Sequence, residues 1–507
     1  IDEYENIYPL EAKVAYLDVC SLHRFDIGVR AGLLSRIEGV NFNEFYKKLM
    51  APLENIVNVN YDYRVGDYVY KSRHQHIANI VFSKTLPSAE EKSQQIIKII
   101  RYLNVSYEAD NLAISQMIKG RILADEFTNK SLVNSIFNVA EDAGIHPAVI
   151  NHQRAVFELH HPGGDLRAAL NYINKAEEEP GSLSRKTLQH TKSNIYRRLA
   201  SSSNIDVEKR KLRQDALTIL NRSMSGTRDS LPYFTKGQIL FEELKERMDL
   251  VKESDSETED EVINELTKQM ESNLVTGLQL FPSDDKLLML ESDYSSYIKD
   301  SPRALKALEQ SFRKNKDSIY TAVRLARSYF STNRREEAIS LLRSTLSNHP
   351  INKTLHFEIA KLLILMDEFS NRDEILTHLK RSFSTGDTHY EARYTYARHE
   401  YLYGDITKSK KEFAELAKIP YPPSALNKVR GDMKTPEGNK IIYHGTVSSV
   451  HGSFCFINCI EFSENIYVHY TALVNSADWP KIIPGARISC HIGFSFRGIA
   501  GHSLAVA

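Results

Sequence analysis

Cysteine is scarce in this sequence, which holds only Cys20, Cys455, Cys459 and Cys490 among 507 residues. So few thiols exclude a disulfide scaffold and fit a reducing compartment. No run of 18 apolar residues occurs, and no basic stretch followed by an apolar segment opens the chain. Neither a membrane span nor a signal peptide is therefore indicated. We expect a cytoplasmic protein without membrane contact.

Excess charge of either sign is also absent, because Lys plus Arg and Asp plus Glu both number 65. A formal net charge of zero excludes bulk electrostatic attraction to nucleic acid or to a membrane. Any nucleic-acid site must therefore be local. At about 150 residues per domain, the length suggests roughly three domains.

Motifs of catalysis are missing as well. The sequence has no G-x-x-x-x-G-K-[ST] phosphate loop, no G-x-G-x-x-G, no G-x-S-x-G and no H-E-x-x-H. Cys455 and Cys459 are four residues apart with no second pair, so burial as small hydrophobic residues explains them better than a zinc site. We expect a chain without a catalytic residue, a metal site or a cofactor of its own.

Residues 1–95 combine helical patterns with one hairpin. Apolar residues at helical spacing predict three helices, the first around Leu10 to Leu17. Alternating residues on both sides of a turn at Arg64 to Asp67, around Gly66, predict the hairpin, and a further helix follows. Three helices, a hairpin and a closing helix make a winged-helix arrangement.

Residues 96–420 are almost entirely helical and carry an internal repeat of 34 residues. The best copy matches the tetratricopeptide repeat at Leu325, Ala326, Tyr329, Ala338, Leu342 and Pro350. Stepping back 34 residues from Ala338 reaches Ala304, while Ala360 and Ala397 mark copies further on. Small residues at these positions let paired helices approach closely, so stacked pairs are expected to form a solenoid.

Two segments interrupt the helices. Residues 250–262 are acidic and almost free of large apolar side chains, which predicts a solvated loop. Residues 421–439 are dense in Pro and Gly, which predicts a linker.

Residues 440–507 read as five short strands with turns, which predicts a small β-barrel. Phe454 and Phe456 share one face of a strand, with Cys455 and Ile457 on the other. In the next strand Tyr467 and His469 share a face, with Ile466, Val468 and Tyr470 behind them. The predicted fold class is therefore mainly α, with a winged-helix domain, an α-solenoid of tetratricopeptide-like helix pairs and a small C-terminal β-barrel.

The barrel segment resembles the cold-shock domain, an oligonucleotide-binding barrel. SFCFI stands where that family has its first ribonucleoprotein motif, and IYVHYTAL stands for the second. Cys455 replaces the glycine between the rings, and Ser449 stands where an aromatic residue is usual. The resemblance implies a stacking platform for single-stranded RNA or DNA, formed by Phe454, Phe456, Tyr467 and His469.

Local charge near this platform is close to neutral, with Lys440 and Arg497 among the few cations. We count these two residues with the nucleic-acid-binding candidates and expect binding that depends only weakly on salt. The alternative use of the ring face is packing against the solenoid, with the rings as interface anchors.

A winged helix that leads into a helical solenoid resembles the C-terminal half of STAND-type signalling NTPases. In many of these proteins a histidine at the start of the helix after the hairpin contacts the bound nucleotide, and Arg73 and His74 stand at that place here. A helix N-terminus favours phosphate through its free N–H groups and dipole. A plain structural role for His74 fits equally well.

The order of winged helix, repeats and terminal barrel resembles antiviral STAND proteins, namely bacterial anti-phage NTPases and vertebrate sterile-alpha-motif antiviral factors. The chain begins with Ile1, directly before a helical pattern, so we expect it to be a piece of a longer protein. The resemblance implies an NTPase domain before Ile1 that uses ATP or ADP, and it leaves open a homo-oligomer of the full-length protein.

Two hypotheses follow for this chain. In the first, it is the non-catalytic sensor region of such an NTPase, whose solenoid recognises a partner and whose barrel binds single-stranded nucleic acid. In the second, it is a scaffold whose repeats capture a protein or peptide, while the barrel only caps the apolar end of the solenoid.

Overall fold

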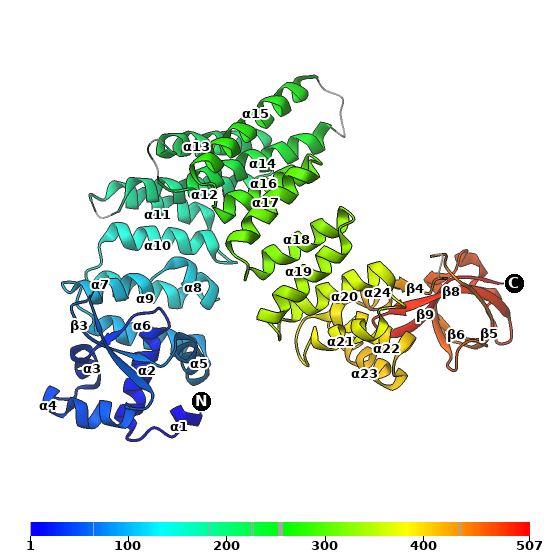
Figure 1. Cartoon of the computed structure of the whole chain (residues 1–507), viewed down its shortest axis with the longest axis horizontal. Helices are drawn as coiled ribbons and strands as arrows, with labels where there is room; N and C mark the ends of the chain where they lie inside the picture. The colour runs from blue at the N-terminus through cyan, green and yellow to red at the C-terminus, as the bar shows by residue number, and fades with distance from the viewer. Residues whose placement is uncertain are drawn as a thin grey trace. The chain divides into compact units, whose positions relative to one another are not determined.

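The computed structural model describes residues 2–63, 65–181, 183–224, 226, 228–251, 257–435 and 438–506. The chain divides into two compact units, unit 1 over Ile1–Leu290 and unit 2 over Glu291–Ala507 (Figure 1). In the described ranges no helix is both long and apolar enough to cross a bilayer.

Unit 1 opens with the helices and the hairpin predicted from the sequence. Its first elements are α1 Asp2–Glu5, α2 Leu10–His23, β1 Val29–Arg30, α3 Ala31–Glu38, α4 Phe42–Phe45, η1 Tyr46–Met50, η2 Ala51–Leu53, β2 Val57–Asp62, β3 Asp67–Ser72 and α5 Gln75–Thr85. The short strand β1 was not predicted, and it pairs with β3 to give the antiparallel order β1-β3-β2. Of the predicted turn, Gly66 has a φ of 68°, in the left-handed region, and Arg64 lies outside the described residues.

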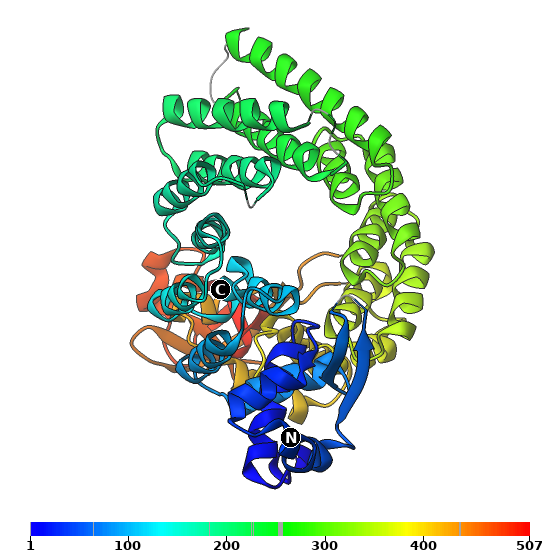
Figure 2. The ribbon, with the colours of Figure 1, turned by 90° about the vertical axis from the view of Figure 1, so that its left-hand side faces the viewer.

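The rest of unit 1 is helical, as predicted. It comprises α6 Ala89–Tyr102, α7 Glu108–Met117, α8 Gly120–Glu126, α9 Lys130–Asp142, α10 Pro147–His160, α11 Leu166–Glu178, α12 Arg185–Ser202, α13 Asp206–Met224, α14 Leu231–Val251 and α15 Glu257–Leu280. Figure 2 shows the helices α10 to α15 of unit 1 stacked in succession. The acidic segment is shorter than the predicted loop, because α14 extends to Val251 and α15 begins at Glu257; residues 252–256 lie outside the described residues.

Unit 2 begins within α16 Asp285–Tyr297 and continues as successive helices that pack on one another. These are α17 Ser301–Lys314, α18 Ile319–Ser331, α19 Arg335–Asn348, α20 Lys353–Asp367, α21 Arg372–Arg381, α22 Tyr390–Tyr403 and α23 Ile406–Leu416. The predicted repeat is confirmed. Ala326 on α18 and Ala338 on α19 are fully buried where the two helices meet, and Ala360 and Ala397 are fully buried in later copies.

The segment predicted as a linker contains regular structure. Its residues form α24 Pro423–Asn427 and β4 Gly431–Asp432, and β4 pairs with β8 of the barrel. Pro422 and Pro423 suit the first turn of α24, where a backbone N–H has no helical partner. Proline density did not indicate that the chain would join the barrel so early.

The C-terminal barrel is closed by five strands. They are β5 Ile442–Val450, β6 Phe454–Cys459, β7 Ile466–His469, β8 Arg487–Ser495 and β9 Gly498–Val506. The order β8-β5-β6-β7-β9 returns to β8, and β7 pairs with β9 in parallel. This is the Greek-key strand order of the oligonucleotide-binding barrel. The last two strands meet in a tight turn at Phe496 and Arg497.

Candidate nucleic-acid interface

The four predicted ring residues lie together on the outer face of β6 and β7. The antiparallel register places Phe454 opposite His469 and Phe456 opposite Tyr467. Ring centroids are 5.3 Å apart for Phe454 and Tyr467, 5.7 Å for Phe454 and Phe456, and 6.2 Å for Phe456 and Tyr467. All four side chains are partly exposed. Sequence alternation alone was sufficient to predict that these residues share a face, which we call the ring face, while its use for stacking on bases stays a prediction.

The residues between these rings form the barrel core. Cys455 and Ile457 on β6, and Ile466 and Val468 on β7, are fully buried. The prediction that Tyr470 would also face the core is wrong, because this residue is 42% exposed. The reason is that β7 ends at His469 and a 3-10 turn begins at Tyr470, so the alternation stops one residue early.

The sequence did not predict a fifth ring, that of His451. This residue lies in the turn between β5 and β6, and its imidazole stacks on Phe454 with a centroid distance of 4.7 Å and an angle of 22°. The pairing of β5 with β6 shifts register between Val447 and Ser449. His451 therefore supplies a ring at the edge of the platform, close to Ser449, where the cold-shock pattern has an aromatic residue. The position of His451 in the sequence, close to the ring motif, was the signal that could have predicted this ring.

A different set of rings joins the barrel to the helices. Phe494 on β8 stacks on Phe413 of α23 with a centroid distance of 6.0 Å and an angle of 6°, and Phe496 lies 5.6 Å from Tyr394 of α22. Phe494 and Phe496 are buried. The alternative hypothesis was that the ring face packs against the solenoid. The structure shows that Phe494 and Phe496, at the end of β8, make this contact instead. The ring face stays partly exposed.

The two predicted cations lie at the borders of the platform. Arg497 is exposed in the turn between β8 and β9. Burial raises the pKa of the Tyr467 hydroxyl, and the charge of Arg497 partly offsets that rise. Lys440 is half-exposed, and its Nζ lies 2.8 Å from Asp432 Oδ2. Lys440 is therefore held by a carboxylate from β4.

Beside the ring face lies a pocket of about 580 Å³, which we call the α24 pocket. Tyr467, His469 and Lys440 all line it, so it brings together three of the predicted residues. The other lining residues are Pro423, Ser424, Asn427, Lys428, Val429, Asp432, Thr471, Ala472, Ala500, Gly501 and His502. The sequence did not indicate this pocket, because one wall is the segment taken for a linker.

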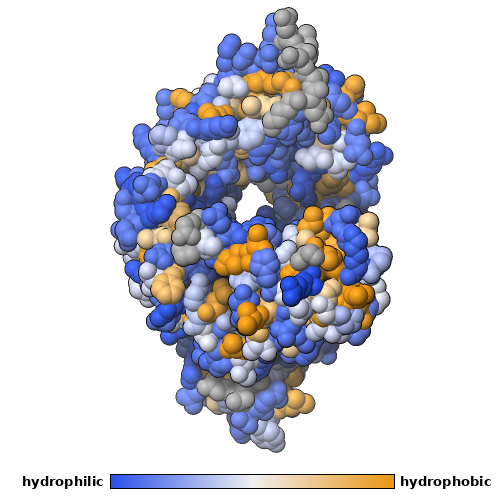
Figure 3. Space-filling model, turned by 90° about the vertical axis from the view of Figure 1, so that its right-hand side faces the viewer, coloured by the Kyte–Doolittle hydropathy of each residue, from blue (hydrophilic) through white to orange (hydrophobic). Residues whose placement is uncertain are grey.

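The hydrophobic surface of the barrel is discontinuous. Figure 3 shows the face on which the barrel is drawn in Figure 1, with hydrophobic residues in separate patches among hydrophilic ones. Ile442, Ile460 and Val474 are exposed on different parts of the barrel, at 60%, 95% and 70%. Single exposed residues of this kind do not form an apolar docking surface.

Arg73 and His74 lie in unit 1, at the start of α5 as predicted. His74 is the N-cap residue, and its Nδ1 accepts a hydrogen bond from the backbone N–H of His76 at 3.0 Å. The neighbouring Ser72 is buried and lies 2.7 Å from Nδ1 of His23. Both Arg73 and His74 are exposed. Capping accounts for the position of His74, while nucleotide sensing stays a prediction.

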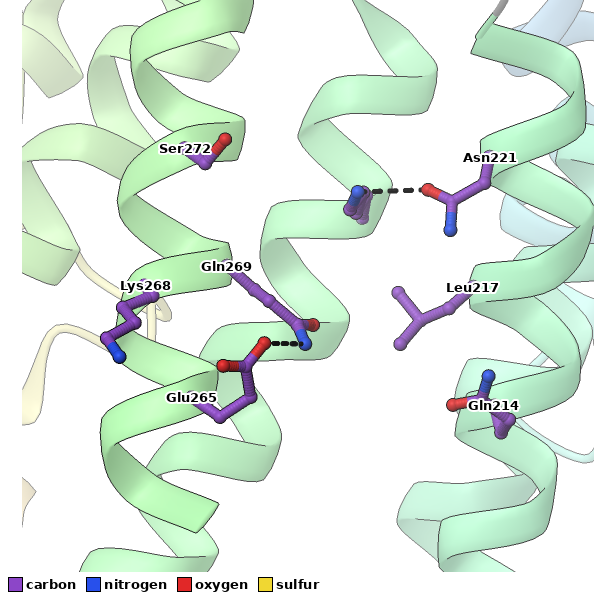
Figure 4. A pocket seen from close by; sticks show the side chains of 8 residues that line it. Gln214, Leu217, Asn221, Glu265, Lys268, Gln269 and Ser272 are labelled. Atoms are coloured by element: carbon purple, nitrogen blue, oxygen red, sulfur yellow. Dashed lines mark hydrogen bonds between the residues drawn. The ribbon is translucent and has the colours of Figure 1, made fainter. Parts of the chain in front are cut away.

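A second pocket lies among α13, α14 and α15 in unit 1 and has a volume of about 500 Å³ (Figure 4). Its lining is mostly polar: Gln214, Leu217, Asn221, Lys236, Glu265, Lys268, Gln269 and Ser272. Lys236 donates to Asn221 Oδ1 at 2.9 Å, and Gln269 donates to Glu265 Oε1 at 2.8 Å. Side-chain amides both donate and accept, so this pocket suits the main chain of a peptide.

Comparison with known proteins adds little to these observations. No family model matches the chain, and no curated protein matches it. Among solved structures it is similar to the human IFIT1 dimer with PPP-AAAA, at 14% identity and a TM-score of 0.31, over 66% of this chain and 73% of that one. A likeness this weak assigns no function, so the residues of the chain itself must carry the assignment.

Proposed function

We propose that this chain is a non-catalytic sensor that binds single-stranded RNA or DNA on the ring face of its barrel. One observation carries the proposal: Phe454, Phe456, Tyr467 and His469 share an outer face, while Phe494 and Phe496 make the contact with the helices. Aromatic side chains that a fold leaves partly exposed in one plane of a sheet are suited to stacking on bases.

Stacking supplies most of the affinity in this account. Each base that stacks on an aromatic ring contributes about 1–3 kcal/mol, and the contribution tolerates any base because every base has a π-face. Few cations border the platform, so neutralisation of phosphates contributes less. Binding should therefore show little sequence preference.

The finer part of the proposal is that the chain is the regulatory region of an antiviral, anti-phage STAND NTPase. The resemblance of the repeats and barrel motifs, and their order after the helix-and-hairpin segment, support it. The NTPase domain would precede Ile1, and Arg73 and His74 would contact its ATP or ADP. The coding sequence upstream of Ile1 tests this part: an open frame that encodes a phosphate loop supports it, and a start codon directly before Ile1 contradicts it.

Fluorescence anisotropy tests the nucleic-acid part on the whole chain. Labelled single-stranded RNA and DNA are titrated with the wild type and with a Phe454→Ala/Tyr467→Ala variant. Loss of two stacking rings should lower affinity at least tenfold, from about 1–3 kcal/mol per ring. A Tyr320→Ala/Phe369→Ala variant is the matched control, because both rings are well exposed in unit 2, Tyr320 on α18 and Phe369 in the turn after α20. Equal affinity of all three proteins would contradict the proposal.

A protein-binding scaffold is the second candidate function. The amide-lined pocket of α13 to α15 favours it, and so does the cap that Phe494 forms on the last helices. A pull-down with the whole chain separates the two functions. Recovery of one protein that survives nuclease treatment, together with no binding of oligonucleotides, would support the scaffold. Recovery that nuclease abolishes would support the sensor.

A further inference from the structure

The α24 pocket continues directly from the ring face. Tyr467 and His469 belong to both, so a strand that stacks on Phe454 and Tyr467 reaches the pocket at its next residue. The far wall is Asn427 and Lys428, at the end of α24, and β4 and β9 supply Asp432 and His502. At about 580 Å³, the pocket lies within the range of about 300–1,000 Å³ typical of small-molecule sites.

Both oxygens of the pocket's single carboxylate already have a partner within the chain. Asp432 Oδ1 lies 2.7 Å from Nε2 of His502, and Oδ2 lies 2.8 Å from Nζ of Lys440. Both oxygens therefore accept from groups of the chain itself, and Asp432 neutralises one positive charge. The pocket retains no strong free acceptor that would attract a cationic ligand.

The groups left for a ligand are mainly donors. Lys428 is exposed and forms no ion pair with any residue in the described ranges. Thr471 approaches Nδ1 of His469 with its hydroxyl at 2.8 Å and its backbone N–H at 3.4 Å. An Nδ1 that accepts from this N–H leaves the proton of the neutral ring on Nε2, which then donates. Lys428 and His469 Nε2–H together suit an anion, and Lys440 can add N–H donors but no net charge because Asp432 balances it.

Asn427, which lines the pocket, also carries an acceptor without a partner. Asn427 Oδ1 is buried and receives no hydrogen bond from the described part of the chain. A buried carbonyl oxygen without a donor costs free energy, so a rotation of Asn427 that offers this oxygen to an N–H or O–H group of a ligand would be favourable. Base amino groups and ribose hydroxyls both supply such a donor. A nucleotide therefore fits the whole lining better than a bare anion.

We propose that the α24 pocket holds a phosphate group of the strand, next to the nucleotide whose base stacks on Tyr467. The proposal rests on the proposed function and adds a polar anchor to it. Stacking on the ring face tolerates any sequence, whereas the pocket fixes where the backbone of the strand runs. The phosphate is either an internal phosphodiester or a terminal phosphate monoester, because both present oxygens to the same donors.

Lys428→Glu on the whole chain is the test. Lys428 is exposed and without an ion-pair partner among the described residues, so its replacement leaves the fold intact. The expected result is about three- to tenfold weaker binding of single-stranded oligonucleotides, with a salt dependence shallower by about 0.7 in log–log slope. Lys481→Glu makes the same charge change elsewhere on the barrel, beside Asp478, and should change affinity less than Lys428→Glu.

Oligonucleotides of one sequence with a 5′-hydroxyl, a 5′-phosphate or a 3′-phosphate separate the two sources. An effect of Lys428→Glu on all three assigns the pocket to an internal phosphate, and an effect on one phosphorylated end assigns it to that end. Equal effects of Lys428→Glu and Lys481→Glu, while Phe454→Ala/Tyr467→Ala still abolishes binding, would overturn the pocket and leave the ring face standing. Failure of the wild type to bind any oligonucleotide would overturn both.

Discussion

The outward direction of the two rings on β6 follows from the burial of the side chains that alternate with them. Cys455 and Ile457 are fully buried, so Phe454 and Phe456 have no room on the inner side and must face outward. His451 then extends the stack past Phe454. At the scale of single residues, the platform is a consequence of a two-residue period with one ring added from a turn.

Replacement of His451 tests how far the platform extends. His451→Ala removes a ring that contacts Phe454 and is itself exposed, so the barrel should stay folded. We expect a moderate loss of affinity for single strands, about two- to fivefold, which is less than one full stacking interaction of about 1–3 kcal/mol. Anisotropy with an RNA 8-mer measures it. Affinity equal to the wild type would place the edge of the platform at Phe454.

Sequence alone predicted Phe454, Phe456, Tyr467 and His469 because their positions follow from alternation within one strand each. It did not predict His451 or the α24 pocket. His451 lies in a turn, where no period fixes the direction of a side chain. Lys428 and Asp432 reach the pocket only because β4 pairs with β8, a contact between residues about 60 apart in the chain.

Closure of the barrel depends on glycine at a strand crossing in β5. A Cβ at Gly445 would lie 2.3 Å from the backbone oxygen of Asn458 on β6, which cannot move without breaking the sheet. We expect Gly445→Ala to destabilise the barrel by about 1–3 kcal/mol or more, as overpacking does. Gly452→Ala is the matched control, since nothing lies within 4 Å of its Cβ position. Urea denaturation, with Trp479 as the barrel's probe, should separate the two variants; equal midpoints would refute this role for Gly445.

Two histidines of the repeat helices make unit 2 sensitive to acid. Nδ1 of His356 lies 2.8 Å from Nδ1 of His378, and Nε2 of His356 donates to the Pro350 carbonyl at 3.1 Å. One proton can lie between the two Nδ1 atoms. Protonation of both Nδ1 atoms would place two N–H groups against each other, which is unfavourable. Burial lowers the pKa of His378 to about 4 and also lowers that of His356.

The sign of the pH dependence follows from these shifts. Below its ordinary pKa of 6.5 an unfolded histidine binds a proton that the folded one does not, so stability is complete above about pH 6.5 and is lost as pH falls towards 4. In this range the free energy of unfolding falls by about 1.4 kcal/mol per pH unit for each histidine. Urea denaturation at pH 7.5 and 5 should show a smaller loss for His378→Gln than for the wild type. His444→Gln, at an exposed histidine, should behave as the wild type; an equal loss in all three would contradict the account.

Helices and strands with a regular hydrophobic period were predictable from sequence, whereas the short segments that connect the solenoid to the barrel were not. The helix pairs followed from alanines 34 residues apart, because only small side chains fit where α18 meets α19. The strand β4 and the short α24 carry too few residues for any period. Their structure comes from pairing with β8, which local sequence does not encode.

At the scale of the whole molecule, balanced charge shapes the expected binding. With 65 basic and 65 acidic residues, the chain has no bulk attraction for nucleic acid, so the proposed binding depends on the few cations Lys428, Lys440 and Arg497. Two or three phosphate contacts predict a log–log salt slope of about −1.4 to −2.1 for a single strand. Affinity titrations between about 50 and about 300 mM salt measure this slope. A slope several times steeper would mean that the main site lies on a basic surface elsewhere.

Photo-crosslinking tests the central claim most directly, because it reports where the strand lies. A single-stranded RNA that carries 5-iodouracil is bound to the whole chain, irradiated, and its crosslinked peptides are identified by mass spectrometry. The account predicts crosslinks to Phe454, Phe456, Tyr467 or His469 on β6 and β7, and their loss in the Phe454→Ala/Tyr467→Ala variant. Crosslinks confined to the helices, with none on the barrel, would contradict it.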